Sequence, residues 1–393
     1  MTEGVVVVLN AGSSSLKFSL YEGDAVLLSG QVDGIGLRPR VMARDGAGTK
    51  LAVPDLATDP PGTPAEALLA LLPWLREHLG GRPLLALGHR VVHGGQHHDR
   101  PRRVTPALIE ELAALSPLAP LHQPHNLSPI RAAQDRVPDV PQVACFDTAF
   151  HRTIPEIAQV FALPFEMAAR GIRRYGFHGL SYEYIASVLP EVAPDLATGR
   201  VVVAHLGNGA SLCALQGGRS VATTMGFSAL DGLPMGTRCG EIDPAVVLHL
   251  MREDGLDIAG VEALLYRRSG LLGLSGLSSD FRDLLASDDP RARFAIDVFV
   301  YRVARGIGSL AAALGGLDAL VFTAGVGENA APIRAAVCDA CRWLGIEINE
   351  TANAMKAPVI TRAGSRVAAY VIPTDENLMI ARHTRALLAG SSE

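Results

Sequence analysis

The sequence has few aromatic residues and no excess of basic ones. Phe, Trp and Tyr make up 5% of its 393 residues, and 35 Lys and Arg stand against 40 Asp and Glu, for a formal charge of −5. Surfaces that bind nucleic acid combine clustered cations with aromatic side chains, and the sequence has neither. We therefore expect no nucleic-acid partner, and an anionic substrate must be bound by individual arginines and lysines.

Long apolar runs are missing too. No run approaches the ~20 residues that a membrane span requires, and no basic segment precedes the first apolar run, so we expect no membrane partner and a cytoplasmic location. Five cysteines, spread over separate segments, favour reduced thiols. Cys338 and Cys341 have the spacing of half a zinc site. Because no second pair exists, two thiols on one helix is the preferred interpretation.

Glycine, in contrast, is abundant and often lies between apolar runs. Residues 201–218, VVVAHLGNGASLCALQGG, have the pattern of strand, glycine-rich turn and strand. Glycines in such a turn let backbone N–H groups approach an anion, which suits a phosphate, although a plain hairpin has the same pattern. Residues 5–23 repeat the pattern 196 positions earlier (201 minus 5). Two copies of one device predict two related halves.

The length also favours two domains. Strand and helix patterns alternate in both halves, which predicts the α/β class. Three segments rich in polar residues, glycine or proline are expected to be loops, at 40–62, 118–129 and 269–279. A final helix is expected at 376–388.

Several charged side chains follow expected strands, where open α/β sheets bind ligands. Arg90 suits a carboxylate or phosphate held bidentately. Asp147 is a natural Mg²⁺ contact, and Glu376 could complete a magnesium shell. Arg238 lies between glycines, where the backbone can approach a ligand. His178 could donate a hydrogen bond to a phosphoryl oxygen, or be a buried structural histidine.

Nucleotide motifs of the common kinds are incomplete. The sequence has no Walker-type phosphate loop. Gly325 and Gly327 lie between an apolar run and an expected helix start, which is a reasonable nucleotide contact. Lys17, beside serine hydroxyls, suits a β- or γ-phosphate, and a polar hairpin tip is the alternative.

The first third of the chain is rich in histidine, which raises the alternative of a metal centre. None of them forms an H-x-x-x-H pair on an expected helix, and no carboxylate lies at ligand spacing, so loop histidines with satisfied hydrogen bonds are favoured. The residues concerned are His89, His93, His97, His98, His122 and His125.

Taken in order, ten motifs resemble those of the acetate kinase (acetokinase) family, within the superfamily of acetate and sugar kinases, heat-shock proteins and actin. The resemblance covers essentially the whole chain. The motifs are LNAGSSSLKF, GHRVVHGG, PLHQPHN, FDTAFH, YGFHGLS, HLGNGAS, MGTRCGEIDP, SGLSSDFR, FTAGVGEN and IPTDENLMIAR.

The resemblance implies two duplicated actin-like (ribonuclease H-like) domains with an active-site cleft between them. The first would comprise residues 1–149 and 377–393, and the second, with the nucleotide and dimer side, residues 150–376. The implied activity is reversible, direct in-line transfer of the ATP γ-phosphoryl to acetate, giving acetyl phosphate and ADP. It implies Mg²⁺, for which Mn²⁺ could substitute, and a homodimer. The alternatives are a propionate or short-chain fatty acid kinase, a non-catalytic actin-like ATP-binding module and a metal-dependent hydrolase.

Site residues are implied wherever the motifs match. The catalytic residues would be Asp147, His178, Arg238 and Arg90. The substrate would contact Arg90, Val92, Leu121 and Ala229. ATP would contact Lys17, His205, Leu206, Gly207, Asn208, Gly209, Asp280, Phe281, Arg282, Gly325, Val326, Gly327, Glu328 and Asn329. The metal would be held by Asn10 and Glu376.

Five positions depart from the usual motifs. Asn377 replaces a second glutamate, Tyr182 a histidine, Cys239 a serine and Glu241 an aspartate. Ala229 replaces a proline in the substrate pocket wall, which would make the pocket roomier, while Val92 is kept and favours acetate. A methylene in an apolar pocket is worth only about 1–3 kcal/mol, so such changes shift the preference between acetate and propionate.

Overall fold

The computed structural model describes residues 4–390, which form two compact units. Unit 1 contains the chain up to Phe150 and from Asp375 onward, and unit 2 is His151–Thr374. The chain therefore crosses between units after residues 150 and 374. The borders expected from the sequence, after residues 149 and 376, lie one and two residues away.

Unit 1 is built on a seven-stranded sheet in the order β4-β3-β2-β1-β5-β7-β6. Its first four strands form an antiparallel meander, β5 and β7 continue the sheet parallel to β1, and β6 is antiparallel to β7. The strands are β1 (Val5–Ala11), β2 (Ser15–Glu22), β3 (Ala25–Asp33), β4 (Arg40–Asp45), β5 (Leu84–Val91), β6 (Arg102–Arg103) and β7 (Gln142–Phe146). The run of valines in β1 is buried because β1 lies in the middle of the sheet.

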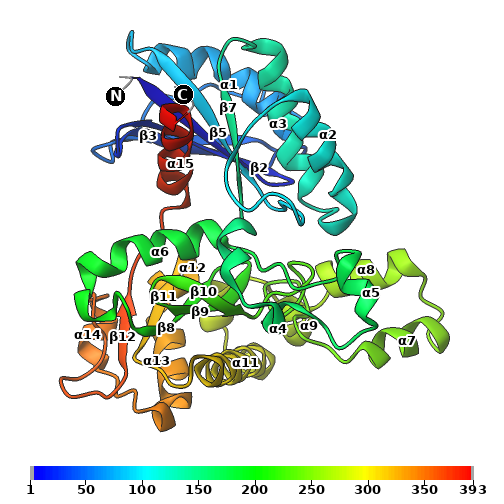
Figure 1. The fold of residues 1–393 in the computed structure, drawn as a ribbon, viewed down its shortest axis with the longest axis vertical. Helices are drawn as coiled ribbons and strands as arrows, with labels where there is room; N and C mark the ends of the chain where they lie inside the picture. The colour runs from blue at the N-terminus through cyan, green and yellow to red at the C-terminus, as the bar shows by residue number, and fades with distance from the viewer. Residues whose placement is uncertain (1–3, 391–393) are drawn as a thin grey trace. The chain divides into compact units, whose positions relative to one another are not determined.

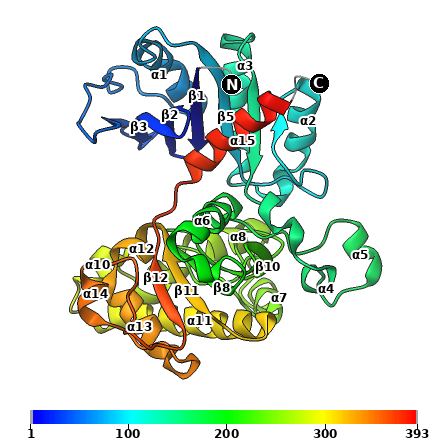
Figure 2. The ribbon, with the colours of Figure 1, turned by 60° about the vertical axis from the view of Figure 1, so that its left-hand side comes forward.

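Helices cover both faces of this sheet. Figure 2 shows α15 (Glu376–Gly390) on one face, and α1 (Pro64–His78) and α3 (Gln123–Arg136) on the other. The α1 helix begins at Thr63, whose side chain accepts a hydrogen bond from the N–H of Glu66. Beside α3 lies α2 (Pro106–Ala114).

Unit 2 is built on a five-stranded sheet in the order β10-β9-β8-β11-β12 (Figure 1). The strands are β8 (Arg200–Leu206), β9 (Ala210–Gln216), β10 (Arg219–Thr223), β11 (Ala319–Thr323) and β12 (Ala368–Val371). An antiparallel meander is again followed by two strands parallel to its first strand. The order matches β3-β2-β1-β5-β7 of unit 1, so the prediction of two related halves is confirmed.

The longest helix, α11 (Pro290–Leu314), packs on the meander of unit 2. It begins after Asp289, whose carboxylate accepts from the N–H of Arg291, and ends at Gly315 in the left-handed region. The other helices of unit 2 are α4 (Glu156–Gln159), α5 (Phe165–Ala169), α6 (Gly179–Val192), α7 (Pro244–Arg252), α8 (Ile258–Arg267), α9 (Gly270–Ser275), α10 (Phe281–Leu285), α12 (Ala324–Asn329), α13 (Ala331–Ala340) and α14 (Glu350–Ala354). Within residues 4–390, no helix is long and apolar enough to cross a membrane.

The three expected loops are partly wrong. Residues 40–45 form β4, because they complete the meander beside β3. Residues 270–275 form α9, and residues 123–129 belong to α3. Pro124 lies in the first turn of α3, where its missing N–H costs no hydrogen bond. Pro129 lies deeper in α3 but is buried with its neighbours, so packing outweighs its poor helix propensity.

Candidate functional site

Three polar residues of unit 1 come together because neighbouring parallel strands end at the same edge of the sheet. Asn10 lies on β1, Arg90 on β5 and Asp147 directly after β7. In the register, β5 pairs with β1 on one side and with β7 on the other. Lys17 is the cross-strand partner of Asn10 on β2. Asn10, Arg90 and Asp147, which the sequence analysis assigned to metal and substrate contacts, therefore lie at one edge of the sheet.

Arg90 is the centre of this cluster. Its Nη2 donates to Oδ2 of Asp147 at 2.5 Å and its Nε to Oδ1 at 3.1 Å, so the two side chains form a bidentate ion pair. Nη1 of Arg90 donates to Oδ1 of Asn10 at 3.4 Å, and Oε2 of Glu376 lies 4.0 Å from Nε. Three residues assigned to chemistry from the sequence, Asp147, Asn10 and Glu376, therefore surround the guanidinium of Arg90.

The ion pair between Arg90 and Asp147 is largely shielded from water. The side chain of Asp147 is 1% exposed, and that of Arg90 is 18% exposed. Burial alone would lower the pKa of Arg90, but the charges of Asp147 and Glu376 and the hydrogen bond to Asp147 raise it above its ordinary value. Arg90 is therefore a permanent cation, and a carboxylate held by it in this way is a weak base.

The oxygens around Arg90 fit a divalent cation of the hard type. Asn10 offers an amide oxygen, and Asp147 and Glu376 offer carboxylates, which are the ligands that Mg²⁺ prefers. One arginine and two carboxylates leave the cluster with one net negative charge. The donor set therefore fits Mg²⁺, with the remaining coordination positions left to water and phosphate oxygens.

Val92 is held in place by Asn126, a residue that the sequence argument missed. The N–H of Val92 donates to Oδ1 of Asn126 at 2.9 Å, and Nδ2 of Asn126 donates to the carbonyl of Ala11 at 2.6 Å. Asn126 thus ties the chain after Arg90 to the first glycine turn. Leu121 lies just before α3 and is partly exposed. Its position in the PLHQPHN motif is the sequence feature that could have indicated a role for Asn126.

The expected ATP-binding segments of unit 2 also follow neighbouring parallel strands. Residues 205–209 end β8 and turn into β9, and α12 follows β11, with His205 and Thr323 side by side in the register. A Cβ atom at Gly236 would lie 2.5 Å from Oδ1 of Asn208, and the N–H of Gly236 donates to the carbonyl of Asn208 at 3.3 Å, so the MGTRCGEIDP loop contacts the turn. Gly325–Asn329, expected as a turn, is helical as part of α12.

His178 and Arg238 converge on this same glycine turn. A Cβ atom at Gly209 would lie 3.2 Å from Nε2 of His178 and 3.5 Å from Nη2 of Arg238. The ring of His178 stacks on that of His205, with centroids 4.1 Å apart and planes 16° from parallel. Nη1 of Arg238 donates to the carbonyl of Ala229 at 2.6 Å. The structure therefore brings together the unit 2 residues expected to contact phosphate and substrate.

Strained backbone gathers around the same segments. The described non-glycine residues with positive φ are His178 (58°), Ala324 (64°) and Lys356 (53°). His178 precedes α6, Ala324 begins α12, and Nζ of Lys356 donates to Oδ1 of Asn329 at 2.8 Å. Such strain tends to persist where function requires it. Lys356 has no motif around it, so its contact with Asn329 could not be predicted from the sequence.

In the expected ATP-binding segment Asp280–Arg282, the two charged side chains pair with each other. The Asp280 carboxylate caps α10, and the Arg282 guanidinium, which is largely exposed, donates to it at 2.5 Å. This hydrogen bond lowers the pKa of Asp280. The side chain of Phe281 packs against Phe299 in the core, so it is not available to a ligand.

Arg334, on α13, holds α12 in place through hydrogen bonds. Its side chain is completely buried, and it donates to the carbonyls of Gly327, Glu328 and Asn353 and to Oδ1 of Asn353. Burial lowers its pKa, but the four hydrogen bonds satisfy a charge that would otherwise be very costly there. Arg334 therefore fixes the end of α12 to α14.

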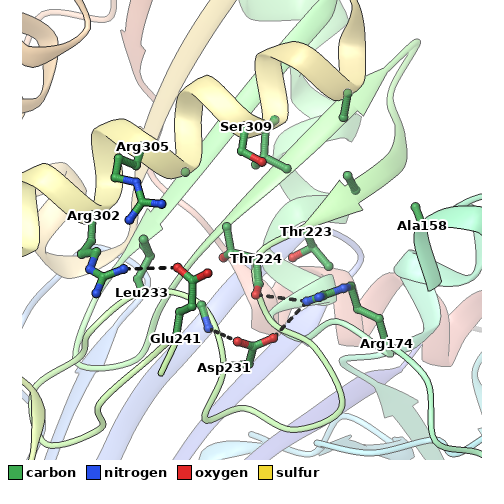
Figure 3. Close-up of a pocket in the computed structure, with 15 residues that line it drawn as sticks. Ala158, Arg174, Thr223, Thr224, Asp231, Leu233, Glu241, Arg302, Arg305 and Ser309 are labelled. Atoms are coloured by element: carbon green, nitrogen blue, oxygen red, sulfur yellow. Dashed lines mark hydrogen bonds and ion pairs between the residues drawn. The ribbon is translucent and has the colours of Figure 1, made fainter. Parts of the chain in front are cut away.

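A pocket of about 360 Å³ lies in unit 2 beside the loop that carries Ala229 and Arg238 (Figure 3). Two ion pairs anchor this loop: Arg174 to Asp231 at 3.0 Å and Arg302, on α11, to Glu241 at 3.3 Å. None of the residues that the sequence assigned to chemistry lines this pocket. The two ion pairs at this pocket hold the loop at Asp231 and at Glu241.

Two of the histidines proposed as an alternative metal centre, His93 and His98, contact other groups. Nδ1 of His93 accepts from the N–H of Gly95 at 2.9 Å, and Nε2 of His98 lies 3.3 Å from Oε2 of Glu111. Within the described part of the chain, no three His, Cys, Asp or Glu side chains group as metal ligands. Burial lowers the pKa of His93 to about 4, so its ring is neutral at pH 7.

The repeated sheet order and the polar strand ends define an α/β protein of the duplicated actin-like ATPase type. The sequence profile described as "Acetokinase family" matches residues 5–382. The chain belongs to the acetokinase family.

Individual relatives agree with this assignment. The acetate kinase of Nitrobacter hamburgensis is 53% identical over 392 residues, which cover 98% of this chain and 97% of that protein. The crystal structure of Porphyromonas gingivalis acetate kinase matches with a TM-score of 0.86 and 37% identity, over 98% of this chain and 100% of that one. A propionate kinase structure from Francisella tularensis matches with a TM-score of 0.88 and 36% identity, over 97% and 98%.

Proposed function

We propose that this protein is an ATP:acetate phosphotransferase that forms acetyl phosphate and ADP reversibly. The observation that carries the proposal is Arg90, a permanent and mostly buried cation at the ends of three parallel strands, in a chain of the acetokinase family. A planar guanidinium in such a position suits the carboxylate of a small acid. Unit 2 would supply the donor side, where residues 205–209, 280–282 and 325–329 would hold ATP.

The proposed reaction needs no general base. A carboxylic acid with a pKa of about 4–5 is already ionised at pH 7, so its oxygen can attack the γ-phosphorus directly as the bond to the ADP oxygen breaks. The bidentate ion pair with Arg90 supports the same conclusion, because it engages both carboxylate oxygens of Asp147. We assign Asp147 the task of orienting Arg90, and with it the substrate.

Charge on the transferring phosphoryl group has to be balanced by this chain's own cations. His178 and Arg238, both beside Gly209, would donate hydrogen bonds to the phosphoryl oxygens. Asn10 and Glu376, with Asp147 beside them, would hold Mg²⁺, which supplies positive charge to the phosphates when bound.

The first test is acyl-phosphate formation, trapped as the hydroxamate, from ATP and Mg²⁺ with acetate, propionate or butyrate in separate reactions. We expect a strong signal with acetate that falls at propionate, because Val92 is buried and held by Asn126. Preference for propionate or butyrate would keep the mechanism but change the substrate. ATP binding without any acyl phosphate would leave a non-catalytic nucleotide-binding module and contradict the proposal.

We also propose a homodimer formed through unit 2. Large apolar side chains are strongly exposed on it, among them Phe165 (89%), Ile157 (87%) and Ile258 (77%). Exposed apolar side chains that form a contiguous patch mark protein–protein interaction sites. Light scattering should give twice the chain mass, and Phe165→Ser with Ile258→Ser should give a monomer. Leu37→Ser, at an equally exposed site of unit 1 (83%), should remain a dimer. A monomeric parent protein would refute the proposal.

A further inference from the structure

Tyr182 lies one side chain away from His178. It is completely buried on α6, and its hydroxyl is 2.5 Å from Oγ of Ser211 on β9. Oγ of Ser211 is in turn 2.8 Å from Nδ1 of His178. A tyrosine, a serine and a histidine therefore form one hydrogen-bonded chain that ends at the imidazole, with its other nitrogen beside Gly209 and Arg238.

We propose that Tyr182 is a positioning residue that, through Ser211, holds the proton of the neutral His178 ring on Nε2. The inference rests on the proposed function, in which Nε2–H of His178 donates to the transferring phosphoryl group. Tyr182 itself touches neither substrate nor phosphate.

The direction of the two hydrogen bonds follows from counting donors and acceptors. Within residues 4–390, Oγ of Ser211 is the hydrogen-bond partner of the Tyr182 hydroxyl. When Tyr182 donates, Ser211 accepts, and the proton of Ser211 is left to donate to Nδ1 of His178. Nδ1 must then carry a lone pair, so the ring proton lies on Nε2.

The opposite direction leaves a polar group unsatisfied. If Nδ1–H of His178 donated to Ser211 and Ser211 donated to Tyr182, the Tyr182 hydroxyl proton would have no acceptor in a completely buried site. Proteins avoid buried donors without partners because the lost hydration is not replaced. Protonation of both ring nitrogens is disfavoured as well, because Ser211 would then receive two donors and its own proton would lack an acceptor.

Tyr182 is well suited to the donor role. Burial raises its pKa well above the ordinary value for tyrosine, so the hydroxyl keeps its proton at neutral pH. The ring of His178 is also restrained by stacking on His205, whose Nδ1 is 2.8 Å from Oγ of Ser181. Stacking fixes the plane of the ring, and the chain from Tyr182 fixes where its proton lies.

The test uses the full-length protein labelled with ¹⁵N-histidine. In the parent protein, two-dimensional NMR should show His178 as the Nε2–H tautomer, with the signal assigned by its loss in His178→Gln. In Tyr182→Phe, Ser211 is free to donate or accept, so the ¹⁵N shifts should move toward a mixture of tautomers. We expect kcat to fall about 10-fold, with KM for ATP and acetate within twofold.

Tyr175→Phe is the matched control. Tyr175 is also buried, and its hydroxyl donates to the carbonyl of Gly171 at 2.9 Å, so this variant loses one buried hydrogen bond without touching Ser211. It should keep the His178 tautomer and kcat. Equal losses of kcat in both variants, or an unchanged tautomer in Tyr182→Phe, would overturn the inference.

Ser211→Ala covers the case in which Tyr182→Phe does not fold. It breaks the same chain at its middle, and it should give the same mixture of tautomers; an unchanged Nε2–H signal would overturn the inference. The NMR readout needs no turnover, so failure of the acyl-phosphate assay would refute the proposed function while leaving the tautomer assignment to be judged separately.

Discussion

Asp147→Asn should lower kcat/KM for acetate about 10²-fold. The amide cannot hold the guanidinium of Arg90 as an ion pair, and a misplacement of a positioning group by about 1 Å typically costs roughly this factor in rate. Because Asp147 also lies beside Asn10 and Glu376, the Mg²⁺ concentration for half-maximal rate should rise. Initial rates measured over a Mg²⁺ series give both quantities.

Asp24→Asn is the matched control for this variant. Asp24, also in unit 1, accepts hydrogen bonds from Arg382 at 2.7 Å and Arg385 at 2.8 Å, but it is exposed. Exposed ion pairs contribute about 0–1 kcal/mol, so its kinetics should be nearly unchanged. If Asp147→Asn kept the parent Mg²⁺ requirement, the magnesium part of its role would be wrong. A variant with parent kcat/KM would remove Asp147 from the site.

Arg238→Ala should lower kcat about 10³-fold while changing KM for acetate much less. The guanidinium is placed beside Gly209 with His178, where the phosphoryl group would lie, and an arginine that balances transition-state charge is typically worth 10³–10⁵ in rate. Guanidinium ion added to the assay should restore part of the lost rate, because the variant leaves room for it.

Arg302→Ala separates charge at the site from support of the loop. Arg302 belongs to the same loop anchorage through its contact with Glu241 at 3.3 Å, but it does not approach Gly209. We expect less than a threefold change in kcat and no rescue by guanidinium. Should Arg238→Ala raise KM for acetate and leave kcat intact, Arg238 would be a ground-state binding residue and the assignment to phosphoryl transfer would fail.

The two sheets of this protein could be predicted from the sequence because local residue patterns encode their strands. Runs of β-branched residues around the glycine turns at 10–15 and 206–210 give central strands, and their repetition gives the two sheets. Once the strands are placed, Arg90 and Asp147 must lie together, because both end parallel strands that are neighbours. Their pairing follows from topology, without knowledge of side-chain packing.

The hydrogen bonds that orient the side chains of the site could not be predicted from local residue patterns. Asn126 reaches Ala11, 115 positions away, and Tyr182 reaches Ser211, 29 positions away. Nothing in the local pattern of these residues separates a positioning role from an ordinary buried polar group. The helical state of residues 123–129 was missed for a related reason, since tertiary burial of α3 outweighs the propensity of its prolines.

The three strained residues have a consequence for anyone who wishes to make this protein more heat-resistant. Glycine relieves a left-handed backbone, so a screen that ranks positions by conformational relief would select His178, Ala324 and Lys356 first. These positions lie in the proposed phosphoryl site, at the start of α12 and in contact with Asn329. Substitutions at these three positions that raise heat resistance are therefore expected to lower turnover. Stabilising substitutions are better sought on the helices of unit 1.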